Sequence, residues 1–109
     1  MILLQKVHIE VTLKQMAIFN TLLHRYIDTT ESTSREIKQN LNIIQLVYVR
    51  GIKKIANKLS SNKKFKFSLE YYEAVAVINA LEVTLNEFES FKYEHSVLYR
   101  IFEEVDSKL

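Results

Sequence analysis

Two stretches of this chain present the same order of local signals, and this duplication constrains the fold more than any other feature. Residues 7–10 alternate between apolar and polar side chains and lead to Thr12, which is suited to cap a helix. Residues 64–66 alternate in the same way and lead to Ser68. Self-similarity at a fixed spacing is the signature of a structural repeat. The sequence therefore predicts a strand followed by a helix at two places.

The ends of the two stretches match as well, because residues 47–59 align with residues 97–109. We interpret this as a strand-helix-helix unit that occurs twice, with repeat 1 over about 5–59 and repeat 2 over about 63–109. At 109 residues the chain has the length of one ordinary domain. Residues 1–109 are therefore expected to share a single core.

Apolar residues spaced three and four apart predict four helices around the two strands. The expected elements are a strand over 5–11, helices over 12–28 and 34–59, a strand over 63–67, a helix capped by Ser68 and a helix over 86–108. Thr12 with Gln15, and Thr33 with Glu36, form capping boxes at two helix starts. The expected fold class is mainly α (α+β): four helices plus a small two-stranded antiparallel sheet, with pseudo-twofold symmetry between the repeats.

The two helices of repeat 2 differ in their apolar patterns. Residues 74–78 are apolar on every side and include two alanines that permit close approach, so their helix is expected at the centre. The last helix carries one seam at spacings of three and four: Phe88, Phe91, His95, Leu98, Phe102, Val105 and Leu109. Because His95 interrupts this seam, it is expected to be buried with a hydrogen-bond partner.

Composition excludes most kinds of active site. The chain has one glycine, no proline and no cysteine, whereas phosphate-binding loops and nucleophile elbows need several glycines. His8, His24 and His95 lack the spacing of metal ligands. Glu103 and Glu104 point about 100° apart on a helix and make no acid-base pair. We therefore expect a protein that is not an enzyme, with no catalytic residue, no metal site and no cofactor.

Hydropathy bears on where the protein acts. No apolar stretch approaches the roughly 18 residues that a membrane-spanning helix needs. The short apolar run that follows Met1 has no basic segment before it, as a secretory signal would. We therefore expect no membrane partner and a cytoplasmic location.

The helix over 34–59 is apolar on more than one side. Its inward seam is expected to consist of Ile37, Leu41, Ile44, Tyr48, Ile52, Ile55 and Leu59. Ile43, Leu46 and Val47 lie on other sides and exceed what one seam needs. Such a surplus marks an interface or is covered by other helices of the same chain. The function favoured by the sequence is a small helical interaction or assembly protein, with a homodimer or another protein as partner through these three residues.

Charge is divided unevenly along the chain. Residues 35–66 hold nine Lys or Arg against one Glu, and residues 67–109 hold nine Asp or Glu against three Lys or Arg. The basic block consists of Arg50, Lys53, Lys54, Lys58, Lys63, Lys64 and Lys66. The alternative function is therefore a nucleic-acid-binding accessory protein that grips phosphates with this block. The simpler interpretation is a solvated surface whose positive charge balances the negative charge of the last helix.

Overall fold

The computed structural model describes residues 5–57 and 63–109. The elements are β1 (Val7–Val11), α1 (Leu13–Thr29), α2 (Arg35–Asn57), β2 (Phe65–Leu69), α3 (Tyr71–Thr84), a short 3-10 helix η1 (Leu85–Phe88) and α4 (Lys92–Asp106). The predicted fold class is confirmed, because four α-helices and one two-stranded antiparallel sheet make up the described part of the chain. The order strand-helix-helix occurs twice, and the pseudo-twofold symmetry between the repeats stays a prediction.

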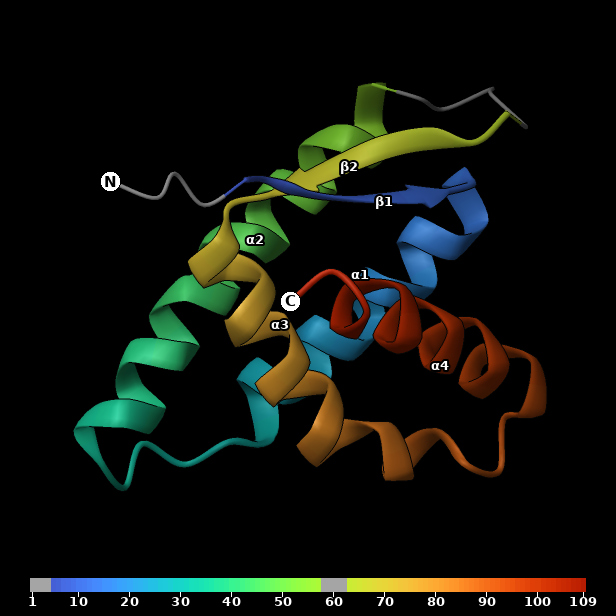
Figure 1. The fold of residues 1–109 in the computed structure, drawn as a ribbon. Coiled ribbons are helices and arrows are strands. Elements are labelled where there is room, and N and C mark those ends of the chain that lie inside the picture. The colour runs from blue at the N-terminus through green and yellow to red at the C-terminus, as the bar shows by residue number, and fades with distance from the viewer. Residues whose placement is uncertain (1–4, 58–62) are drawn as a thin grey trace.

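The sheet lies across one end of the helices (Figure 1). Its two strands pair in the register Val7↔Leu69, His8↔Ser68, Ile9↔Phe67, Glu10↔Lys66 and Val11↔Phe65. Alternate residues of β1 are buried, as the sequence predicts. An isolated two-stranded ribbon is marginally stable, so this sheet depends on the helices beneath it. One such contact joins the rings of Phe19 and Phe67, whose centroids lie 6.4 Å apart in an edge-to-face arrangement.

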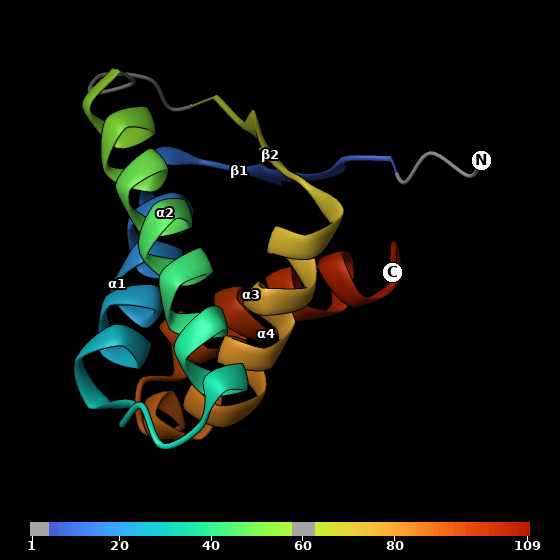
Figure 2. The same cartoon turned by 90° about the vertical axis from the view of Figure 1, so that its left-hand side faces the viewer.

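Helix α3 contacts α1, α2 and α4, and Figure 2 shows it beside α2 and in front of α4. Helix α1 also contacts the three other helices, so α3 shares the predicted central position with α1. Ala74, Ala76 and Ala80 are buried along it, and their small side chains let the neighbouring helices approach closely. Val75 differs from the expectation of an all-round buried segment, because it is 38% exposed.

The helix caps follow the sequence at α1 and depart from it at α3. Thr12 and Gln15 exchange the two hydrogen bonds of a capping box, at 3.2 and 2.9 Å. Ser68 does not cap α3, because β2 continues to Leu69 and the Ser68 hydroxyl lies 2.6 Å from His8 Nδ1 on the opposite strand. The cap is instead Glu70, whose N–H donates to the Glu73 carboxylate at 2.8 Å.

The last helix is shorter and turned differently than predicted. It begins at Lys92 rather than Asn86, after η1. Its buried residues are Val97, Leu98, Ile101 and Val105. Phe91 is 56% exposed, and His95 is only partly buried and stacks on Tyr99 with ring centroids 6.4 Å apart. The predicted core position of His95 was wrong, because the aliphatic stripe fills the core and leaves the aromatic residues at its margin.

Candidate interaction surfaces

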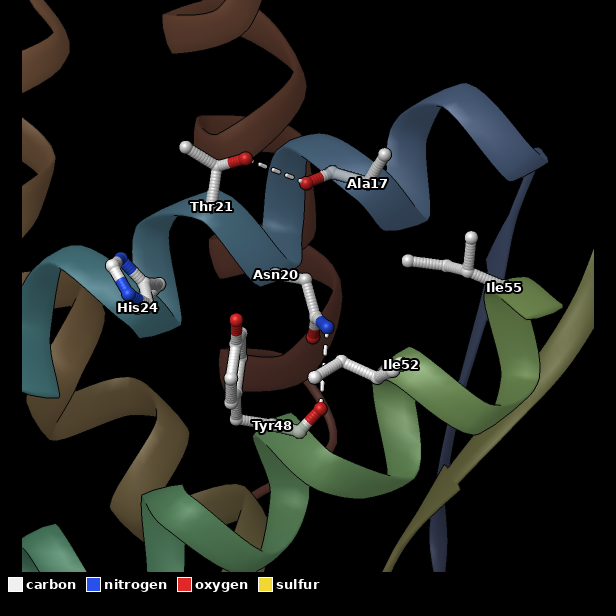
Figure 3. Close-up of a pocket in the computed structure, with 7 residues that line it drawn as sticks. All are labelled: Ala17, Asn20, Thr21, His24, Tyr48, Ile52 and Ile55. Carbon is white, nitrogen blue, oxygen red and sulfur yellow. Dashed lines mark hydrogen bonds between the residues drawn. The ribbon is translucent and has the colours of Figure 1, made fainter.

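The crossing of α1 and α2 is built around Gly51, the only glycine of the chain. Asn20 is 5% exposed, and its Nδ2 donates to the Tyr48 carbonyl at 3.2 Å (Figure 3). A Cβ at Gly51 would lie 2.1 Å from Asn20 Oδ1, so only glycine leaves room for this side chain. Gly51 has no positive φ. It therefore serves helix packing, and a lone glycine inside a helical pattern was the signal in the sequence.

A hollow of about 330 Å³ opens beside this crossing, lined by Ala17, Asn20, Thr21, His24, Tyr48, Ile52 and Ile55. Its polar groups serve the helices themselves. The Thr21 hydroxyl donates to the Ala17 carbonyl at 2.9 Å. Asn20 Oδ1 is the buried side-chain atom in the described chain that has no hydrogen bond, and it faces Gly51, where a Cα–H···O contact is available. We interpret the hollow as a gap left where α1 and α2 pack against each other, and not as a binding site.

A second row of residues runs along α2 beside its buried residues, and its members are exposed or partly buried. Its members alternate at spacings of three and four: Glu36, Gln39, Ile43, Leu46, Arg50 and Lys53. No charged residue stands between Lys38 and Arg50, so the middle of the row is neutral. We call these six residues the outward row. The inward side of α2 buries Ile44, Val47 and Gly51.

The three residues predicted for a partner interface have different environments. Leu46 is 62% exposed and Ile43 is partly buried. Val47 is 0% exposed and belongs to the core. Val47 is therefore unavailable to a partner, and this part of the prediction was wrong. Ile52, expected in the inward seam, is instead 47% exposed, because the helix turns Val47 and Gly51 toward α1 and the core.

Helix α3 extends the exposed apolar surface beside the outward row. Tyr72 is 57% exposed and Val75 is 38% exposed. Both line a hollow of about 350 Å³ between α2 and α3, together with Gln39 and Ile43. Aromatic and aliphatic side chains thus flank a neutral stretch of helix. A surface with this composition resembles the centre of a protein interface, from which charged residues are depleted.

The basic block has one member with a structural role. Arg50 Nη1 lies 2.5 Å from Glu73 Oε2, and Nη2 donates to the Ser68 carbonyl at 2.5 Å. Glu73 is only 3% exposed, so Arg50 supplies the opposite charge that a buried carboxylate needs. Sequence analysis gave Glu73 no role, because its burial and its pairing with Arg50 arise only when α2 packs against α3.

The other cations of the block gather where α2 and β2 approach each other. Arg50, Lys53, Lys54 and Lys66 line a hollow of about 300 Å³, together with Asn57, Phe67 and Ser68. Among residues 5–57 and 63–109, no carboxylate lines this hollow. Lys63 and Lys64 are exposed nearby in sequence, and Lys58 lies outside the described residues. We call the hollow the basic slot.

Two aromatic rings at the basic slot lie beneath cations. The Lys54 ammonium is 5.8 Å from the centroid of the Phe65 ring, and the Arg50 guanidinium is 5.3 Å from that of Phe67. Both rings are thus covered by their own chain. In the described chain, Lys53, Lys54 and Lys66 form no ion pair with a carboxylate of α4. The balance of charge between the basic block and the acidic last helix therefore involves no direct ion pair at these three lysines, and it stays a prediction.

Neither a protein family, nor a curated protein sequence, nor a solved structure shows significant similarity to this chain. Within residues 5–57 and 63–109, no three His, Asp or Glu side chains are placed to share a metal ion. None of the helices in this part of the chain combines the length and the apolar character needed to cross a membrane. The surfaces described above are accordingly the features on which a function can be argued.

Proposed function

We propose that this protein is a non-enzymatic assembly module that forms a homodimer through the outward row of α2. The observation that supports it is the symmetry of that row. Gln39 and Arg50 lie equally far from the midpoint between Ile43 and Leu46, and so do Glu36 and Lys53. A surface with this property can pack against its own copy about a twofold axis.

Antiparallel packing of two α2 helices about that midpoint would place each residue of the row opposite a complementary residue of the second copy. Ile43 of one copy would meet Leu46 of the second copy, and the reverse. Glu36 would meet Lys53 of the second copy at each end of the contact. The centre would bury apolar side chains that are now in water, and the charged ends would set the register. Parallel packing would instead bring Lys53 against Lys53.

The flanking residues of α3 increase the contact. Tyr72 and Val75 stand beside Ile43 at the hollow between α2 and α3, where a second helix could rest. A stable dimer needs roughly 800 Å² from each partner, which is more than one helical row supplies. The exposed Tyr72 side chain is also of the type that dominates binding energy at interfaces.

Nucleic-acid binding through the basic block remains the alternative. Single-stranded nucleic acids are held by cations together with open aromatic faces. The basic slot offers cations, but the rings of Phe65 and Phe67 lie beneath Lys54 and Arg50. This arrangement favours the dimer over nucleic-acid binding as the proposed function.

Sedimentation of the purified protein tests the dimer. We expect a dimer at micromolar concentration, and a folded monomer with unchanged helical content for Leu46→Glu, because Leu46 is 62% exposed and its loss leaves the core intact. Phe91→Glu is the matched control, since Phe91 is 56% exposed on α4, and it should remain a dimer. A native protein that sediments as a monomer throughout, or two variants that dimerise equally, would contradict the proposal.

A further inference from the structure

The two outer edges of the sheet are covered differently. On β1, the Glu10 N–H donates to Glu104 Oε2 at 3.3 Å, and Lys108 Nζ donates to the His8 carbonyl at 2.5 Å. Side chains of α4 and the residues after it thus satisfy backbone groups that point away from β2. An edge strand treated in this way has few open positions for pairing with another chain.

The same alternation exposes the outer edge of β2. Glu10 pairs with Lys66 and His8 with Ser68, so the peptide groups of Lys66 and Ser68 point away from β1. The hydrogen bond from Arg50 to the Ser68 carbonyl confirms this direction. Within the described chain, no helix or strand hydrogen-bonds the Lys66 peptide group. This N–H and C=O are therefore available to a further strand.

The open edge of β2 borders the basic slot. Lys66 and Ser68 contribute to it from the strand, and Lys53, Lys54 and Asn57 contribute from α2. In Figure 1 β2 passes the C-terminal half of α2. The slot thus combines the unpaired Lys66 peptide group with the ammonium groups of Lys53, Lys54 and Lys66, and no carboxylate of the described residues lines it.

We propose that the outer edge of β2 binds an extended acidic peptide segment as a third strand. Backbone hydrogen bonds to Lys66 would hold the segment in register. Its side chains would alternate between the outer face of the sheet, beside Lys66, and the side of α2, beside Lys53 and Lys54. Carboxylates at either set of positions would meet an ammonium group, which selects an acidic segment over a neutral one.

Charge also decides against other occupants of this edge. A second copy of β2 would bring Lys64 and Lys66 against the same lysines, and like charges facing each other across strands are destabilising. A nucleic acid would satisfy the lysines but has no alternating amide pattern for the edge. The basic slot shares Lys53 with the outward row, but the deciding group, the Lys66 peptide, lies outside that row. Peptide binding and sedimentation therefore report on the two proposals separately.

Fluorescence anisotropy with a labelled, terminally blocked heptapeptide of alternating glutamate and valine tests the proposal with the full-length protein. We expect saturable binding that weakens as salt is raised. The same peptide with N-methylated valine amides keeps the charge but loses alternate donors, and it should bind at least about tenfold more weakly. Lys66→Glu should weaken binding by a similar factor, whereas Lys92→Glu, a matched charge reversal on exposed α4 residue Lys92, should leave it unchanged.

Amide hydrogen exchange supplies the second readout. The Lys66 amide should exchange more slowly when the peptide is bound, because its N–H then donates to the added strand. Equal binding of the methylated and unmethylated peptides, or an unprotected Lys66 amide in the complex, would show that charge alone acts and would overturn the proposal. Binding of an oligothymidylate without binding of the peptide, or no binding of the peptide at low salt, would overturn it as well.

Discussion

Asn20 Oδ1 lies 2.1 Å from the place where any residue other than glycine at position 51 would put its Cβ. The amide nitrogen of the same side chain donates to Tyr48 on α2. Asn20 thus links the two helices by filling a notch that Gly51 creates. Because this contact is tight, the packing of α1 against α2 is sensitive to the addition of a single methyl group at position 51.

Gly51→Ala should destabilise the protein by about 2 kcal/mol, as overpacking in a close-packed contact does. Alanine favours a helix by about 1 kcal/mol over glycine, but here its methyl group must displace Asn20. Urea unfolding followed by circular dichroism measures the change. In the double variant Asn20→Ala/Gly51→Ala the added methyl group finds space, so the two effects should be less than additive by about 1 kcal/mol. A stabilising Gly51→Ala would contradict this account.

Arg50→Met should destabilise the protein by about 2 to 3 kcal/mol, because it leaves the Glu73 carboxylate buried without its cation. Methionine retains most of the apolar stem, so the change reports the lost charge more than lost packing. Lys38→Met is the matched control on the same helix, and as an exposed residue it should change the free energy of unfolding by less than about 0.5 kcal/mol. Equal effects of the two substitutions would show that Glu73 does not depend on Arg50.

Reversing charge in the outward row tests the antiparallel arrangement itself. Glu36→Lys alone and Lys53→Glu alone should each weaken the dimer, since either change places like charges at both ends of the contact. The double variant Glu36→Lys/Lys53→Glu restores opposite charges in every pair and should recover the native dimerisation constant within about threefold. Sedimentation at several concentrations measures the constants. If the double variant is weaker than both single variants, the two residues do not face each other in the dimer.

The strands and helices could be predicted because their signals are local. The Thr12 capping box and the alternation in Val7–Val11 depend on residues that are neighbours in sequence. The cap of α3 was misplaced because Ser68 has two compatible uses, and pairing with His8 across the sheet decided between them. Hydrophobic spacing also cannot fix which of two overlapping stripes faces inward, as Val47 and Ile52 show.

Sites that join distant segments could be predicted only in part. The surplus apolar residues of α2 and its cluster of cations were visible in the sequence. Leu46 is exposed, and its place in an interface stays a prediction. The ion pair between Arg50 and Glu73 required the packing of α2 against α3. The open edge of β2 required knowledge of which backbone groups face β1. Neither relationship leaves a pattern in the order of residues.

The contacts that cover β1 have a consequence for the course of folding. The hydrogen bonds to Glu104 and from Lys108 span 94 and 100 positions of the chain. During synthesis β1 leaves the ribosome before α1 and α2, yet both its pairing strand and its edge cover arrive much later. Helices α1 and α2 can form early from local interactions, whereas the ribbon must wait for closure of long loops. The sheet should therefore be among the last parts to become ordered, and the unpaired β1 is the segment through which a nascent chain would misassemble.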